Sequence, residues 1–264
     1  MARSRDGGED PQADIKPSSS FPHFSTLVHL HFYVGTVPPH AYRRWFAGLT
    51  SDASGAGLIS GAAIIYIRAM PINSTPYVLA LGDSLTAGYG LPTRASFAAK
   101  LEQALHDRDP YATVHNAGVS GDTTADALRR LPSVLSGLAR KPDLAIVELG
   151  ANDLLRGVAP ARTRANLDEI LGTLRSCGIA TFLTTFEVPP FLRAHAPSYD
   201  GMYADLAARH GADHAPFFPP GVMGHPRLTL PDGLHPNACA IELVVAHLLP
   251  AIISALGRPP APLA

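Results

Sequence analysis

The serine at position 84 is the first residue in the chain whose setting suggests chemistry. It belongs to the tetrad Gly-Asp-Ser-Leu at 82–85, which directly follows the apolar run 77–81. A hydroxyl at the point where a buried strand meets a loop is well placed for nucleophilic attack in an α/β fold. The same tetrad can also form a turn in which Asp83 and Ser84 cap the next helix.

A candidate base for this serine lies far along the chain, in the segment Pro-Asp-Gly-Leu-His-Pro-Asn at 231–237. A serine hydroxyl is a weak nucleophile at neutral pH, so it needs a base and a partner that orients the base. Asp232 and His235 are three residues apart, so one turn can bring the carboxylate to the imidazole. Asp232 could also be the N-cap of that turn. We expect Ser84 to be the nucleophile, His235 the base and Asp232 the orienting acid.

Two further segments offer hydrogen-bond donors at the ends of apolar runs. They are Asn-Ala-Gly-Val-Ser-Gly at 116–121 and Gly-Ala-Asn-Asp at 150–153. Donors at the carboxyl end of a strand can stabilise the oxyanion that forms when a serine attacks a carbonyl. A turn glycine at Gly118 and a helix or turn cap at Asn152 are the alternative interpretations.

These four segments, in this order, resemble the sequence blocks of the GDSL or SGNH hydrolases, a family whose name records a Ser, a Gly, an Asn and a His. The matching residues here are Ser84, Gly118, Asn152 and His235. Three longer stretches are similar to the bacterial thioesterase I, arylesterase and lysophospholipase L1 branch of that family: 82–92, 116–131 and 149–157. The resemblance covers the chain from about residue 76 to about residue 256.

The resemblance implies an activity and a set of roles. It implies a serine hydrolase that cleaves short- to medium-chain acyl esters and thioesters through an acyl-enzyme on Ser84, without a cofactor. Arylesterase, acyl-CoA thioesterase and lysophospholipase activities belong to this class. The oxyanion hole would consist of the backbone N–H groups of Ser84 and Gly118 and the side-chain amide of Asn152. We expect the carboxylates of Asp83 and Asp153 to cap backbone N–H groups and brace their loops.

Other functions remain open at this stage. A carbohydrate O-deacetylase of the same fold is the nearest alternative, although the stretch 118–123 argues against it. A lipid- or glycan-binding module that has lost turnover is a more distant one. An α/β-hydrolase is disfavoured because Thr86 stands where the second glycine of Gly-x-Ser-x-Gly would be. The chain departs from the family branch at 191–195, a loop that we expect to border the acyl site and to affect substrate preference.

The regular pattern of the chain after residue 76 predicts how these residues are positioned. Apolar runs predict five strands, at 77–81, 112–116, 144–149, 179–186 and 212–217. Helical periodicity predicts helices that include 95–106, 162–176 and 237–256. Strands that alternate with helices predict a parallel sheet covered on both faces. The resemblance implies a three-layer α/β/α flavodoxin-like fold with five parallel strands in the order 2-1-3-4-5, which brings the four segments to one edge of the sheet.

The composition excludes several classes of function. Lys plus Arg number 21 against 22 Asp plus Glu, and only 16% of residues are charged, so nucleic acid is not an expected partner. Cys177 and Cys239 match neither a metal site nor a redox pair, and we expect two free, buried thiols. The twelve histidines are scattered, and we predict no metal. We expect a monomer that acts on a small acyl substrate, and peripheral contact with lipid is compatible with that substrate.

The N-terminal 75 residues differ from the rest of the chain. Residues 1–20 are polar and rich in Gly, Ser and Pro, and we expect them to be disordered. The pair Arg43-Arg44 followed by the apolar run 57–67 could be a targeting signal, and the alternatives are a helix lying on the domain or a disordered extension. The domain at 76–256 is then periplasmic or secreted if the signal operates, and cytoplasmic otherwise. Translation could also start at Met70, and residues 257–264 are expected to be a flexible tail.

Overall fold

The computed structural model describes residues 75–186, 188, 197–199 and 201–258. All of them belong to the unit Tyr66–Ala264. The N-terminal extension with its candidate targeting segment, the 191–195 loop and the end of the C-terminal tail lie outside the described residues.

Five parallel strands form the centre of the domain, in the order β2-β1-β3-β4-β5. They are β1 (Tyr77–Gly82), β2 (Thr113–Gly118), β3 (Leu144–Glu148), β4 (Ala180–Thr185) and β5 (Asp213–Pro216). Every strand boundary lies within two residues of the boundary expected from the apolar runs. The expected fold class and strand order are therefore confirmed.

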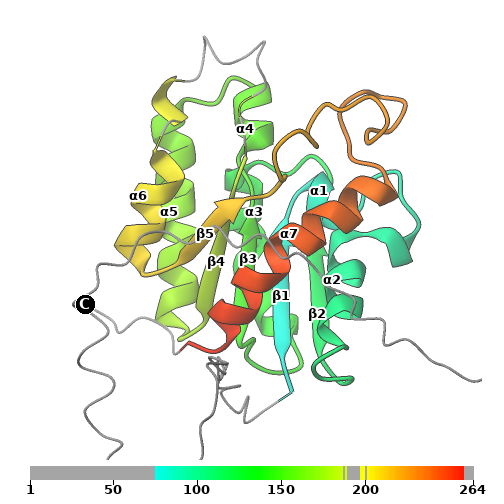
Figure 1. Cartoon of the computed structure of the whole chain (residues 1–264). Helices are drawn as coiled ribbons and strands as arrows, with labels where there is room; N and C mark the ends of the chain where they lie inside the picture. The colour runs from blue at the N-terminus through cyan, green and yellow to red at the C-terminus, as the bar shows by residue number, and fades with distance from the viewer. Residues whose placement is uncertain (1–74, 187, 189–196, 200, 259–264) are drawn as a thin grey trace, which may run out of the picture. The chain divides into compact units, whose positions relative to one another are not determined.

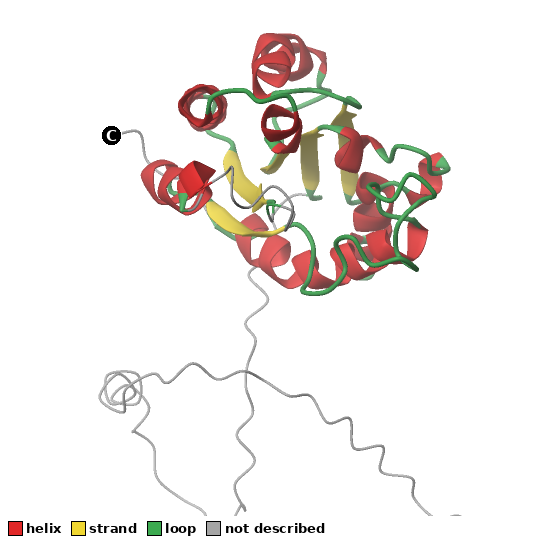
Figure 2. Ribbon diagram, turned by 90° about the horizontal axis from the view of Figure 1, so that it is seen from above, coloured by secondary structure: helices red, strands yellow, loops and turns green. Residues whose placement is uncertain are grey.

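Helices cover both faces of this sheet (Figure 1). One face carries α2 (Phe97–Leu105) and α7 (Ala238–Leu256), and the other carries α3 (Thr124–Gly137), α5 (Pro160–Ser176) and α6 (Met202–His210). Two short helices, α1 (Ser84–Ala87) and α4 (Ala151–Leu155), start just after the carboxyl ends of β1 and β3. Single 3-10 turns occupy Thr93–Ala95 and Pro197–Tyr199. Seen from above, the strands lie between the two helix layers (Figure 2).

Strand β3 shows how the sequence produces two cores. Leu144 and Ile146 belong to the core under α2 and α7, whereas Ala145 and Val147 belong to the core under α3, α5 and α6. Successive side chains on a strand point to opposite faces of the sheet. A strand covered on both faces therefore has to be a continuous apolar run, which is why β3 was recognisable in the sequence.

Helix α7 owes its apolar composition to this packing. Among the described helices it is the one that is long and apolar enough to cross a membrane. Its stripe of Ile241, Val244, Leu248 and Ile252 is fully buried in the core beside the sheet. The helix continues through Pro250 and ends at Leu256, as its periodicity predicted.

The two cysteines differ from expectation. Both are unpaired, but both are exposed, so the prediction of buried thiols is wrong. Cys177 is the residue that ends α5, and Cys239 lies in the first turn of α7 beside the buried Ala240 and Ile241. The physical reason is that the apolar stripe of each helix is narrow, and neither cysteine falls on it.

Candidate active site

Ser84 lies at the junction between β1 and α1, at the carboxyl end of a strand that is flanked by β2 and β3. Asp83 is the N-cap of α1, and its Oδ1 accepts a hydrogen bond of 3.0 Å from the Leu85 N–H. Ser84 is the first residue of the helix, so its own N–H lies among those that have no partner within the helix. Asp83 thus caps the helix, and this cap is compatible with Ser84 as the nucleophile.

His235 lies next to this serine. Its Nε2 is 3.0 Å from Ser84 Oγ, and its Nδ1 is 2.6 Å from Asp232 Oδ2. The segment that carries it is held by the bond from the Leu230 N–H to the His235 carbonyl and by the Thr229–Pro236 bridge. The structure thus joins the expected acid, base and nucleophile in one hydrogen-bonded row.

Asp232 makes the contacts that both interpretations of the sequence require. One carboxylate oxygen contacts His235, and the other accepts hydrogen bonds of 3.0 Å from the N–H groups of Leu234 and His235. The hydrogen bond from the Leu234 N–H, followed by those from His235, lowers the pKa of Asp232 to about 2. The carboxylate is therefore ionised at neutral pH and can hold the imidazole in one orientation.

Tyr89 is a neighbour of the imidazole that the sequence analysis did not identify. Its ring centroid lies 4.4 Å from that of His235, with 36° between the ring planes. The Tyr89 N–H also donates to the Ser84 carbonyl at 3.0 Å, so one residue contacts both members of the pair. The only sequence signal was its place in the stretch 82–92 that follows the serine.

Gly118 is not placed as expected. Its N–H donates to Asn116 Oδ1 at 3.0 Å, while the next N–H, that of Val119, donates to the Gly82 carbonyl on β1. Successive N–H groups along a strand point to opposite sides. The Gly118 N–H therefore faces the free edge of β2, away from Ser84, and the expectation that it lines the oxyanion hole is wrong for this geometry.

The missing side chain of Gly118 is explained by packing. A Cβ at this position would lie 2.3 Å from the backbone nitrogen of Ala87 in α1. Gly118 is needed because α1 packs directly on the end of β2, and neither an approaching substrate nor a positive φ is required to explain it.

Gly121, in the same segment, is the better candidate for the backbone donor. Its φ is 85°, and its N–H has no hydrogen-bond partner among the described residues. The carbonyl of the following residue, Asp122, accepts a hydrogen bond of 3.0 Å from Asn152 Nδ2, so the turn at Gly121 lies beside the other expected donor. The sequence could have indicated this, because a glycine before Asp-Thr is typical of a tight turn that exposes backbone N–H groups.

Asn152 is brought to the site by α4, which starts at Gly150 with a φ of 116°. A Cβ on Gly150 would lie 2.1 Å from the Tyr203 hydroxyl, which donates to the Leu149 carbonyl at 2.9 Å. Asn152 Nδ2 contacts Asp83 Oδ2 and the Asp122 carbonyl, each at 3.0 Å. One amide nitrogen thus connects the loops after β1 and β2.

Charged side chains brace these loops. Asp153 is fully buried and accepts from the N–H and hydroxyl of Thr124 at the start of α3. Arg130 of α3 donates to Asp122 Oδ2 at 2.6 Å and to the Gly82 carbonyl at 3.0 Å. The prediction that Asp83 and Asp153 cap backbone N–H groups is confirmed.

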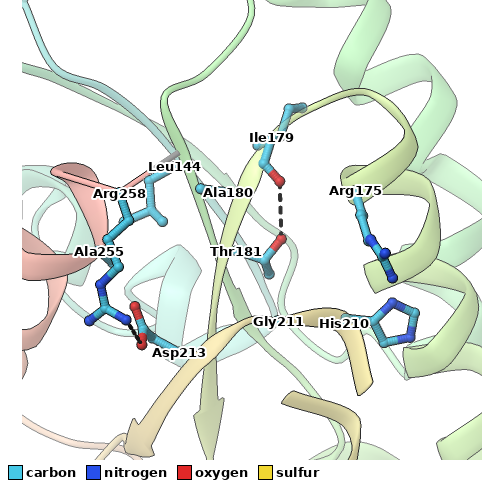
Figure 3. A pocket seen from close by; sticks show the side chains of 10 residues that line it. All are labelled: Leu144, Arg175, Ile179, Ala180, Thr181, His210, Gly211, Asp213, Ala255 and Arg258. Atoms are coloured by element: carbon cyan, nitrogen blue, oxygen red, sulfur yellow. Dashed lines mark hydrogen bonds and ion pairs between the residues drawn. The ribbon is translucent and has the colours of Figure 1, made fainter. Parts of the chain in front are cut away.

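A cavity elsewhere in the domain does not overlap this site. Its lining includes the first residues of three strands, Leu144, Ala180 and Asp213, so it lies at the amino edge of the sheet (Figure 3). Ser84 and Asn152 follow the carboxyl ends of strands, at the opposite edge. Within the residues that the structure describes, no group of His, Cys, Asp and Glu side chains is arranged to hold a metal ion.

A serine, imidazole and carboxylate row beside a side-chain amide on a five-stranded α/β/α sheet defines an SGNH hydrolase. Residues 80–239 match the GDSL-like Lipase/Acylhydrolase family, and the chain belongs to that family. It is a GDSL/SGNH esterase or thioesterase, a hydrolase of class EC 3.1.

The relatives locate the chain within the family. It is 37% identical over 161 residues to an arylesterase of Vibrio mimicus, which covers 61% of this chain and 80% of the relative. It is 34% identical over 161 residues to thioesterase 1/protease 1/lysophospholipase L1 of Escherichia coli K12, and this match covers 61% of this chain and 75% of the relative. The SGNH-hydrolase family esterase AlinE4 has a similar structure, with 44% identity, a TM-score of 0.57, and 69% of this chain and 97% of that chain covered. The chain therefore lies in the thioesterase I and arylesterase branch.

Proposed function

We propose that this enzyme hydrolyses short- to medium-chain acyl esters and thioesters through an acyl-enzyme on Ser84. The observation that carries the proposal is the continuous row from Ser84 Oγ through His235 to Asp232, with separations of 3.0 Å and 2.6 Å. That row supplies a nucleophile, a base and an orienting acid in hydrogen-bond contact.

The reaction begins when His235 accepts the proton of Ser84 as the oxygen attacks the acyl carbon. The carbonyl oxygen becomes an oxyanion, and the leaving alcohol or thiol departs with the proton from His235. Water then attacks the acyl-enzyme, again with His235 as base, and releases the acid. Asp232 stays ionised throughout and stabilises the imidazolium.

The oxyanion would be bound by the N–H groups of Ser84 and Gly121 and by the amide of Asn152. Both N–H bonds of Asn152 already have acceptors in Asp83 and Asp122, so Asn152 must share one of them with the oxyanion. Its position is nevertheless fixed before substrate arrives, which is the condition for electrostatic stabilisation of a transition state.

Apolar side chains around the row support an acyl group as the substrate. Six large apolar residues of the described chain are exposed, and four of them lie in the segments that carry the site residues. Val119 follows the end of β2, Leu155 ends α4, Leu234 precedes His235, and Tyr89 stacks on His235. Exposed apolar groups that gather in one place commonly mark a ligand-binding surface.

The proposal is tested by the initial rates of the full chain on p-nitrophenyl esters and on acyl-CoA thioesters, from acetyl to dodecanoyl. The expected result is turnover with an optimum at one chain length, and none with Ser84→Ala. A serine-reactive phosphonate should label the unaltered chain and leave Ser84→Ala unlabelled. Activity confined to acetylated sugars would show a deacetylase, and a chain that neither turns over nor becomes labelled would be a binding module.

A further inference from the structure

Two acidic side chains share a buried site directly beneath the candidate nucleophile. Asp83 is 1% exposed and Glu148, the last residue of β3, is 3% exposed. The two carboxyls are neighbours: Glu148 pairs in register with Gly82, the residue before Asp83, and each group influences the pKa of the other. Two carboxyls that share a buried site do not both ionise, so the pair holds one proton.

The hydrogen bonds indicate where that proton resides. Burial raises the pKa of Asp83, but the hydrogen bonds that it accepts from the Leu85 N–H and from Asn152 Nδ2 favour its ionised form and oppose that rise. Burial, and then the neighbouring charge of Asp83, raise the pKa of Glu148 well above its ordinary value. Glu148 is therefore the neutral acid that donates, and Asp83 is the carboxylate that accepts.

The chain is shaped to admit Glu148 at this position. Thr86 donates its hydroxyl proton to Glu148 Oε2 at 3.0 Å, and Thr86 is itself buried. Gly82 pairs with Glu148 across the strands, and a Cβ on Gly82 would lie 2.0 Å from Thr86 Oγ1. The glycine of the tetrad thus leaves room for the contact between Thr86 and Glu148.

The surroundings of the pair contain few other charges. A proton on His235 would lower the pKa of Asp83, and the pKa of the buried Tyr203 hydroxyl is raised, first by burial and then by the neighbouring Tyr199 and Asp153. Arg130 reaches the Gly82 carbonyl but is paired with Asp122. Each of these groups has a partner of its own, so Glu148 is the group that neutralises the site by holding a proton.

We infer that Glu148 is a positioning residue for the oxyanion hole. As a neutral acid it donates to Asp83 and holds it in the orientation in which Asp83 Oδ2 binds the Asn152 amide. Without this donor the buried Asp83 would lose a partner, and Asn152 would lose its fixed position. The inference rests on the proposed function, because it assigns Asn152 to the oxyanion.

The inference is tested with the variants Glu148→Gln and Glu148→Leu. Each is made in the otherwise unaltered chain and in the Asn152→Ala background, and kcat and KM are measured on one p-nitrophenyl ester. Glutamine can still donate to Asp83 and accept from Thr86, so kcat should stay within about threefold. Leucine cannot, and kcat should fall by roughly ten- to a hundredfold with little change in KM, since a mispositioned oxyanion donor acts in the transition state. In the Asn152→Ala background the leucine change should cost less than about twofold, because its route of action is already lost.

Thr184→Val is the matched control. Thr184 is buried on the neighbouring strand and donates to the Val147 carbonyl, without contact to Asp83. Its effect on kcat should be small, and additive with Asn152→Ala. If Glu148→Leu does not fold, Thr86→Val removes the hydroxyl that anchors Glu148, and its loss of kcat should likewise disappear in the Asn152→Ala background.

Two results would overturn the inference. The first is full additivity: Glu148→Leu, or Thr86→Val, lowers kcat by the same factor in the Asn152→Ala background as in the unaltered chain. The second is a loss of kcat in Glu148→Gln that is as large as the loss in Glu148→Leu. Turnover that persists in Ser84→Ala, measured in the same assay, would instead overturn the proposed function, so the two failures are distinguishable.

Discussion

His235 Nε2 lies 3.0 Å from Ser84 Oγ, although the two residues are separated by 151 positions in the chain. The contact exists because Ser84 follows the interior strand β1 and His235 precedes α7, which packs on the face of the sheet that also carries α2. The loop before α7 must therefore pass over the carboxyl ends of the strands. The chemistry depends on this single approach between two elements.

Ser84→Ala and His235→Ala should each reduce kcat by roughly four or more orders of magnitude, because serine and histidine act as one unit. The double variant should be no worse than either single one. Steady-state kinetics on one ester, with circular dichroism as a control for folding, measures this. Additive losses would contradict a mechanism in which His235 activates Ser84.

Gly118→Ala should destabilise the fold before it affects the chemistry. A Cβ at 118 would lie 2.3 Å from the backbone of Ala87, and overpacking of this kind costs about 1–3 kcal/mol in the free energy of unfolding. Urea denaturation of the variant measures that cost. A loss of kcat at unchanged stability would return Gly118 to the oxyanion hole in place of Gly121.

Tyr89→Ala should lower kcat by about two- to tenfold, since a stacked ring pair is worth about 0.5–1.5 kcal/mol. Tyr89→Phe is the matched control, because it keeps the ring 4.4 Å from His235 and removes only the hydroxyl. Its kcat should be unchanged. Equal losses in both variants would show that the hydroxyl, rather than the ring, supports the imidazole.

Asp232 should contribute to stability in a pH-dependent way. Hydrogen bonds from the Leu234 N–H and from His235 lower the pKa of Asp232 to about 2 in the folded chain, from an ordinary value of 3.8. A carboxyl whose pKa is depressed by folding stabilises the fold above its unfolded pKa, and this stabilisation is lost as the pH falls through the folded value.

The difference in unfolding free energy between the unaltered chain and Asp232→Asn should therefore be constant from about pH 5 upward and shrink below about pH 4. Urea denaturation over that range measures it. A difference that does not change with pH would mean that Asp232 is not held ionised by these hydrogen bonds.

Most of the fold and the catalytic row could be predicted from the sequence, because they depend on local patterns. A strand buried on both faces, such as β3, reads as a continuous apolar run, and Asp232 and His235 are close in sequence. The orientation of the Gly118 N–H depends on strand register, which no local pattern reports. The tight turn at Gly121, by contrast, has a local signal in the glycine that precedes Asp-Thr. Glu148 did have a signal, as the one charged residue in the run 144–149.

The exposed apolar residues beside the site should determine acyl-chain preference. If Leu155 and Leu234 contact the acyl chain, Leu155→Ser and Leu234→Ser should raise KM for the longer esters and leave acetyl esters unaffected, since each buried methylene is worth about 0.8 kcal/mol. Tyr111→Ser is the control, because Tyr111 is 76% exposed but precedes β2 at the opposite edge of the sheet. Rates across the p-nitrophenyl ester series measure the effect. Equal changes on short and long esters would show that these side chains support the site without contacting the acyl chain, and the preference for chain length would then arise elsewhere in the molecule.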